Sequence, residues 1–162
     1  MLFRSPPSAG EQPCQITWGE MFSVLPFGNR TVIETLTGAQ LQQAFLNGFA
    51  PACDPNFAGG TGRFPQISGL RVTYACTGLT PVVTGMWKTP GGIGAPETPI
   101  GPADTVRFVT NDFMYGGGDG YTVFAQGTDV QQPGDDLLTV SIDYVTANPS
   151  ISPVVEGRIV KQ

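Results

Sequence analysis

A cluster of glycines within one short stretch is the feature that most constrains how this chain folds. Residues 116–120 are four glycines and one acid, Asp119. Glycine costs backbone entropy and adds no packing, so such a cluster is expected where the chain needs unusual φ/ψ angles or a close approach to its backbone. The run before it, residues 105–110 (TVRFVT), is β-branched and typical of a strand. The sequence therefore predicts a strand that leads into a bare loop carrying one carboxylate.

Phe113 and Asp119 indicate which kind of ligand such a loop could take. An aromatic side chain beside a carboxylate suits a molecule with a flat ring and neighbouring hydroxyl groups, and a nucleoside is such a molecule. A calcium site in the loop would need several further oxygen ligands, and the repeats that normally supply them are absent. A tight surface turn without a ligand is the remaining alternative, because glycine-rich loops are weak signals by themselves.

The composition is that of one globular domain with many turns. The chain has 162 residues, 40% hydrophobic and 13% charged, with 22 glycines and 15 prolines. This length can bury a core, and the low charge favours a secreted, periplasmic or cell-wall protein. No apolar run is long enough to span a bilayer. Residues 1–7 show no signal peptide, so we expect any export signal to lie upstream.

The charge and the residue types exclude several classes of function. A formal net charge of −5 and scattered basic residues argue against a nucleic-acid polymer as partner. The chain contains no histidine, which is the commonest metal ligand and the usual general base near neutral pH. A Ser-His-Asp triad and an ordinary zinc site therefore cannot be built here. We expect no catalytic residue and no metal site in this chain.

The three cysteines are too widely spaced for a metal knuckle. They can form one disulfide and leave one thiol, and we favour Cys53–Cys76 over pairings with Cys14. That bond would close a loop of roughly 20 residues and contribute about 3 kcal/mol. Three buried free thiols are the alternative.

Two capping boxes mark the starts of helices. In residues 17–20 (TWGE) and 37–40 (TGAQ), the threonine hydroxyl and the acid or amide that follows can each satisfy a backbone N–H. They predict helices over residues 18–25 and 39–49. One face of the second helix is apolar and should be buried; it carries Leu41, Ala44, Phe45 and Gly48.

The remaining segments define the fold class. We expect strands at residues 30–36, 67–74 with a break at 68–69, 81–88, 105–110 and 154–160. A helix should begin near Tyr121, and Asp135 or Asp136 should cap a last helix that runs to Ala147. Residues 50–61 and 89–103 are loops, and 1–15 form an irregular entry segment. Because there is no regular βαβ alternation, we expect an α/β (α+β) fold, a single compact domain over 1–162 with a mixed β-sheet flanked by short helices.

A series of short stretches runs in order along nearly the whole chain. None is specific alone, but their order and spacing resemble the C-terminal substrate-binding domain of the 5′-nucleotidase family. The stretches are Phe3-Arg4, ITW at 16–18, LPFGN at 25–29, LTG at 36–38, FPQISGL at 64–70, NDF at 111–113, GGDGY at 117–121 and VEGRI at 155–159.

The resemblance implies that two domains have different roles. In the family, an N-terminal metallophosphoesterase domain holds two divalent metal ions that activate water, and the C-terminal domain binds the nucleoside. This chain, which has no histidine, looks like the substrate domain alone. We therefore expect no cofactor in this chain, a nucleoside or nucleotide as ligand, an N-terminal metallophosphoesterase domain as partner, and no hydrolysis of nucleoside monophosphates by this chain by itself.

The resemblance also implies roles for five residues. Phe27 and Phe113 match the two aromatic plates that clamp the base. Asp119 matches the acid that accepts hydrogen bonds from the ribose hydroxyls, and Asn29 matches a residue near the base edge. Arg4 matches an arginine that helps to hold the phosphate.

Two positions depart from the family pattern. Met1 and Leu2 replace the glycines that precede the arginine in the family. Tyr115 replaces a small or polar residue and would narrow the site or add a stacking surface.

Each assignment has a simpler alternative. The two phenylalanines could pack in the core, Asp119 and Asn29 could be turn residues, and Arg4 could be a terminal residue without a role. Two further readings of the whole chain also stay open: a free-standing nucleoside-binding module or pseudo-enzyme, and the same fold serving UDP-sugar, cyclic-nucleotide or sulfur-compound hydrolysis.

Overall fold

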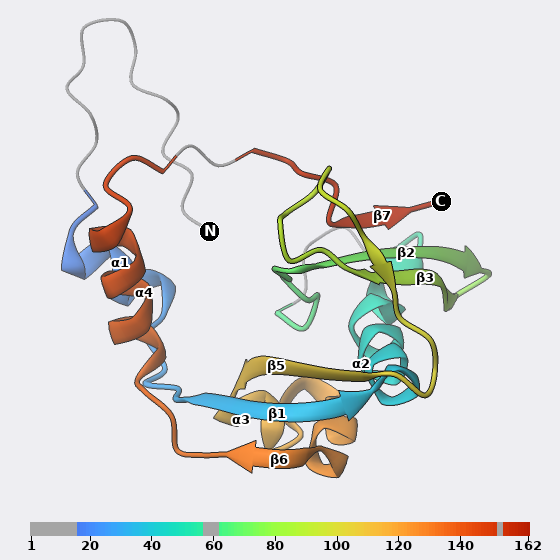
Figure 1. The fold of residues 1–162 in the computed structure, drawn as a ribbon, viewed down its shortest axis with the longest axis horizontal. Coiled ribbons are helices and arrows are strands. Elements are labelled where there is room, and N and C mark those ends of the chain that lie inside the picture. Colours follow the sequence, from blue (N-terminus) through green and yellow to red (C-terminus); the bar gives the residue numbers. More distant parts are fainter. Residues whose placement is uncertain (1–15, 57–61, 152–153) are drawn as a thin grey trace, which may run out of the picture.

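The structure is a computed structural model of the chain and describes residues 16–56, 62–151 and 154–162. Two β-sheets lie on either side of the helix α2 (Gly38–Phe49), as Figure 1 shows. The expected class, mixed α and β elements with short helices, is confirmed. The entry segment, including Arg4 and Cys14, lies outside the described residues.

The first sheet has three antiparallel strands with β1 (Thr31–Thr37) in the centre. β5 (Thr105–Asn111) pairs along one side and β6 (Thr128–Gln131) along the other. β1 alternates between half-buried and buried residues, and its buried side chains are Val32, Glu34 and Leu36. One face of this strand therefore holds a carboxyl group between two apolar side chains.

The second sheet has four strands in the order β4-β3-β2-β7. These are β4 (Thr98–Pro99), β3 (Thr80–Lys88), β2 (Leu70–Thr77) and β7 (Ile159–Lys161). β2 and β7 are parallel and the other pairs are antiparallel, so this is the mixed sheet that the sequence predicts. The separate antiparallel sheet around β1 was not expected.

Helix α2 contributes side chains to both hydrophobic cores. Its capping box forms as predicted, with the Thr37 N–H bonded to Gln40 Oε1 (2.8 Å) and the Gln40 N–H to Thr37 Oγ1 (3.2 Å). The larger core packs α2 against the second sheet and consists of Leu41, Phe45, Phe49, Cys53, Val72, Tyr74, Met86, Ile100 and Val106. The smaller one lies toward the first sheet and consists of Leu36, Ala44, Tyr121, Val123 and Phe124.

Helices α1 (Trp18–Val24) and α4 (Leu137–Ala147) lie side by side at one edge of the molecule (Figure 1). Both begin where the sequence predicts: Thr17 forms a capping box with Glu20, and Asp136 Oδ1 accepts from the Thr139 N–H at 2.9 Å. Neither helix contains a buried residue. Local capping chemistry thus marks both starts, and the start of α4 is also bonded to the segment that enters β1.

Several segments differ from the sequence-based expectations. The segment after Tyr121 is the 3₁₀-helix η3 (Thr122–Gln126) instead of an α-helix. Short elements that were not predicted also form, namely η1 (Ala50–Cys53), β4, α3 (Asp112–Tyr115), η2 (Gly118–Gly120) and β6. The last strand covers only 159–161, and residues 154–158 have no strand structure. For β4, β6 and β7, pairing with distant strands, which local sequence does not encode, sets where the strand forms.

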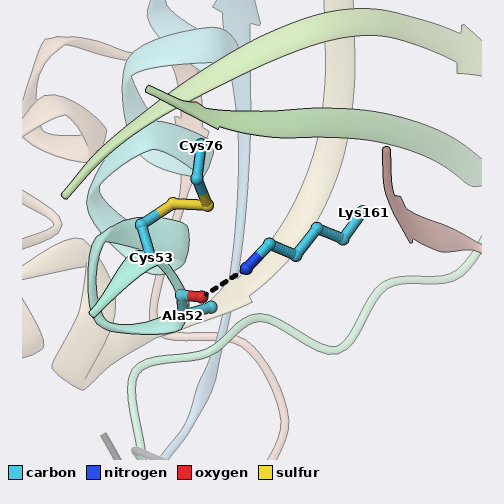
Figure 2. The surroundings of a disulfide bond; sticks show 4 residues. All are labelled: Ala52, Cys53, Cys76 and Lys161. Atoms are coloured by element: carbon cyan, nitrogen blue, oxygen red, sulfur yellow. Dashed lines mark hydrogen bonds between the residues drawn. A yellow bond between two sulfur atoms is a disulfide. The ribbon is translucent and has the colours of Figure 1, made fainter. Parts of the chain in front are cut away.

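The predicted disulfide joins Cys53 at the end of η1 to Cys76 in β2 (Figure 2). Next to it, Lys161 Nζ donates a hydrogen bond of 3.0 Å to the carbonyl of Ala52. Cys53 belongs to the larger core, so the bond ties the C-terminal end of α2 to the second sheet.

Candidate functional site

The segments that carry Phe27 and Phe113 meet at one end of the β1–β5 pair. The strands are antiparallel with Thr31 opposite Asn111, so the chain that enters β1 lies beside the chain that leaves β5. Phe27 lies in the turn before β1, and Phe113 lies in the short helix α3 (Asp112–Tyr115) directly after β5. The topology therefore brings together two stretches that are far apart in sequence.

Asp112 connects these two stretches through hydrogen bonds. Its Oδ1 accepts from the N–H of Arg30 (3.1 Å) and from the N–H of Phe113 (2.9 Å). Its own N–H donates to the Arg30 carbonyl at 2.9 Å. Asn111 caps the same helix, since its Oδ1 accepts from the Met114 N–H at 2.8 Å. The position of α3 relative to the start of β1 is therefore fixed.

Neither phenylalanine is a core residue. Phe27 is 82% exposed and Phe113 is 51% exposed. Among the described residues, neither ring stacks on another aromatic side chain, whereas the core residues Phe45, Phe49 and Phe124 do. The alternative that these two residues pack in the core is therefore wrong.

The glycine loop brings Phe113 against the backbone next to Asp119. The Phe113 ring lies over Gly118, where a methyl group would be 2.5 Å from the ring. Only glycine leaves room for this contact. Asp119 follows in the 3₁₀ turn η2 (Gly118–Gly120) and has left-handed backbone angles, φ 53° and ψ 23°. Its side chain is exposed.

The loop is attached to α2 and to the segment before β2. Asn47 Nδ2 donates to the carbonyl of Asp119 at 3.0 Å. Tyr121, only 2% exposed, donates its hydroxyl proton to the carbonyl of Arg63 at 2.6 Å. Burial raises the pKa of Tyr121 to about 12, with a smaller contribution from the negative charge of Asp119 and an opposing one from Arg63. The phenol stays protonated and remains a donor.

The other predicted site residues are placed less centrally. Asn29 is half-buried, and its carbonyl accepts from the Leu137 N–H at 2.9 Å, which fixes the Phe27 turn to the start of α4. Tyr115 packs, partly buried, against the smaller core. Arg4 lies outside the described residues.

The described residues show no metal-ligand cluster. Within residues 16–56, 62–151 and 154–162, no three or more His, Cys, Asp or Glu side chains are grouped so that they could hold a metal ion. No helix in these ranges is long and apolar enough to cross a membrane. A pocket of about 200 Å³ lies between α2 and β3, but its lining contains none of the five predicted site residues.

The model of one protein family, the C-terminal domain of 5′-nucleotidase, matches residues 2–126. The chain belongs to this family. The match covers the Phe27 turn, the glycine loop and η3. It stops before β6, α4 and β7.

Individual relatives agree with this assignment. The Bacillus subtilis trifunctional nucleotide phosphoesterase protein YfkN is 34% identical over 93% of this chain, and the Listeria monocytogenes cell wall protein Lmo0130 is 29% identical over 89%. The crystal structure of a 5′-nucleotidase precursor from Thermus thermophilus matches 90% of the chain with 30% identity and a TM-score of 0.75. The chain spans 10% and 17% of the length of the two relatives and 28% of the crystallised chain.

Two residues at the site were not singled out from the sequence. Asp112 follows a strand and precedes an aromatic, and an Asn-Asp pair at such a place is a helix-cap signature that could have indicated it. Asn47 carries no such local signal. Its contact with Asp119 spans 72 positions and becomes visible only in the fold.

Proposed function

We propose that this chain is the nucleoside- or nucleotide-binding domain of a metal-dependent 5′-nucleotidase-type phosphoesterase. Phe27 and Phe113 hold the base between them, Asp119 accepts hydrogen bonds from the ribose hydroxyls, and Asn29 lies near the base edge. In the whole enzyme, two divalent metal ions in a separate N-terminal domain supply the activated water for hydrolysis of nucleoside monophosphates. Arg4 helps to hold the phosphate.

One observation carries the proposal: the exposed Phe113 ring lies over Gly118, and the next residue of the loop is the exposed Asp119. A base stacks on such a ring for about 1–3 kcal/mol, with little preference among bases. A carboxylate next to it can bond both hydroxyls of a ribose. The turn that carries the second exposed ring, Phe27, enters β1 at the same end of the sheet.

The proposal includes a place outside the cytosol. A disulfide between Cys53 and Cys76 persists in oxidising compartments. A similar protein, Lmo0130, is named a cell wall protein, and others are venom 5′-nucleotidases. We propose that this protein is secreted, periplasmic or attached to the cell wall.

Replacing Phe113 by alanine should weaken the binding of adenosine and AMP. We expect the chain itself to bind both with a Kd in the high-micromolar to millimolar range, where 1 mM corresponds to about −4 kcal/mol. The Phe113→Ala variant should bind about fivefold more weakly or worse, because it loses one stacking contact. Chemical-shift titration measures affinities in this range.

Tyr144→Ala is the matched control for that titration. Tyr144 is an aromatic residue with 63% exposure in α4, and its removal should leave the affinity unchanged. Equal affinity of the Phe113→Ala variant and the wild type would contradict the base clamp.

We also expect this chain by itself to release no phosphate from AMP when Mn²⁺, Mg²⁺ or Zn²⁺ is added. It has no histidine, and the proposal assigns metal-activated water to a separate domain. Phosphate release is followed over hours with protein from two independent purifications. Turnover that scales with protein concentration, and that the two preparations share, would refute the assignment of the chain to substrate binding alone.

A further inference from the structure

Asn47 contacts the loop that carries Asp119, and the proposed function gives it no role so far. Its Nδ2 donates to the Asp119 carbonyl at 3.0 Å. Its Oδ1 faces Gly120, where a methyl group would lie 2.8 Å away. Asn47 belongs to α2, whose buried face joins both cores, so the amide is held on a fixed element.

Asp119 has a backbone that benefits from such a support. Left-handed angles are uncommon for residues other than glycine and are less favourable for aspartate than the right-handed region. The bond from Asn47 is made to the backbone carbonyl and not to the carboxylate, so it restrains the backbone from which the exposed Asp119 side chain projects. It therefore sets the direction in which the carboxylate leaves the loop.

We infer that Asn47 is a specificity-determining residue of this site: by holding Asp119, it makes binding depend on the two ribose hydroxyls. The inference rests on the proposed function. Phe113, the ring proposed to stack on the base, is held independently of Asn47. Asn111 and Asp112 accept hydrogen bonds from the first N–H groups of α3, the helix that carries it. Removing the Asn47 amide should weaken recognition of the diol and spare recognition of the base.

The test compares adenosine with 2′,3′-dideoxyadenosine in the same titration. The wild-type chain should prefer adenosine by about tenfold or more, since the dideoxy sugar offers no charge-assisted hydrogen bond to Asp119. In the Asn47→Ala variant this preference should fall below about threefold while the affinity for the dideoxy ligand stays unchanged. Alanine is the best helix former, so α2 should tolerate the change.

Two further variants separate the hydrogen bond from side-chain volume. Asn47→Asp keeps the shape but replaces the donor by an oxygen that faces the Asp119 carbonyl, so it should behave like Asn47→Ala. Gln43→Ala removes an exposed amide from the same helix and should keep the wild-type preference.

Each outcome separates this inference from the proposed function. Three outcomes overturn the role of Asn47 and leave nucleoside binding intact. The preference for adenosine could be unchanged in Asn47→Ala, that variant could lose the same affinity for both ligands, or Asn47→Asp could keep the wild-type preference. If the wild-type chain binds neither ligand, the proposed function fails and the inference falls with it. Phe113→Ala should weaken the binding of both ligands by the same factor, and this distinguishes loss of base stacking from loss of the contact with the ribose hydroxyls.

Discussion

A chain without the Cys53–Cys76 bond should unfold about 6–12 °C below the wild type, since about 3 kcal/mol corresponds to that shift for a domain of this size. The bond closes a loop with a sequence separation of 23. Opening it lets the unfolded chain explore more conformations, and this lowers the free energy of unfolding. The double variant Cys53→Ala, Cys76→Ala in a Cys14→Ser background tests this by thermal denaturation.

The reference for that comparison is the Cys14→Ser chain with its disulfide intact. A reducing agent should lower the transition of this reference to about that of the double variant and should leave the double variant itself unchanged. Equal transitions for oxidised reference and double variant would contradict a stabilising role for the bond. The larger core is the region expected to loosen first, because Cys53 is one of its buried members.

The sequence predicts the parts of the fold that local chemistry determines. Thr17, Thr37 and Asp136 each cap a helix where a hydroxyl or carboxylate reaches its own backbone a few residues on. The strand before the glycine loop follows from its β-branched run. These interactions form within one turn of chain, so no knowledge of the rest of the fold is needed.

Elements that depend on distant partners could not be found in this way. β6 is short and polar, and it becomes a strand by pairing with β1 across a register shift between Ile33 and Thr35. β7 is only as long as its pairing with β2, from Val72 to Tyr74. The position and length of such a strand depend on the neighbouring strand with which it pairs, and a single sequence does not show which strand that is.

The candidate site shows the same division. Phe27, Phe113 and Asp119 stand in recognisable short motifs, so a resemblance finds them. The residues that hold them in place do not stand in such motifs. Asn47 is a half-buried helix residue, and it contacts the loop only after the chain has folded. Sequence reasoning thus reaches the groups proposed to touch the ligand and misses the groups that hold them in place.

Glu34 is an ionisable residue at a position of β1 that the fold buries. The alternation of β1 places it on one face with Val32 and Leu36, and all three are buried. In the described part of the chain, neither carboxyl oxygen of Glu34 has a hydrogen-bond partner. A methyl group on Gly127 would collide with its Oε2, so the carboxyl is packed against the backbone of that residue. Burial of this kind favours the neutral form and raises the pKa of Glu34 from 4.5 to about 7.

This raised pKa predicts a stability that falls with rising pH. Below pH 4.5 the carboxyl is protonated in both states, and the neutral group contributes its full stability. Between 4.5 and about 7 the unfolded chain releases the proton while the folded chain retains it, so the free energy of unfolding decreases. Above 7 the loss is complete, and it amounts to about 3 kcal/mol.

The Glu34→Gln variant should remove this dependence. The amide has the same size and does not titrate, so the stability of the variant relative to the wild type should rise by about 3 kcal/mol between pH 4.5 and pH 8. Urea denaturation at both pH values measures the change. Asp143→Asn, which removes an exposed carboxylate from α4, is the control and should shift stability by less than about 0.5 kcal/mol. Parallel pH profiles for the wild type and Glu34→Gln would show that Glu34 is ionised without penalty in the folded chain, and that the centre of the first sheet admits a charge.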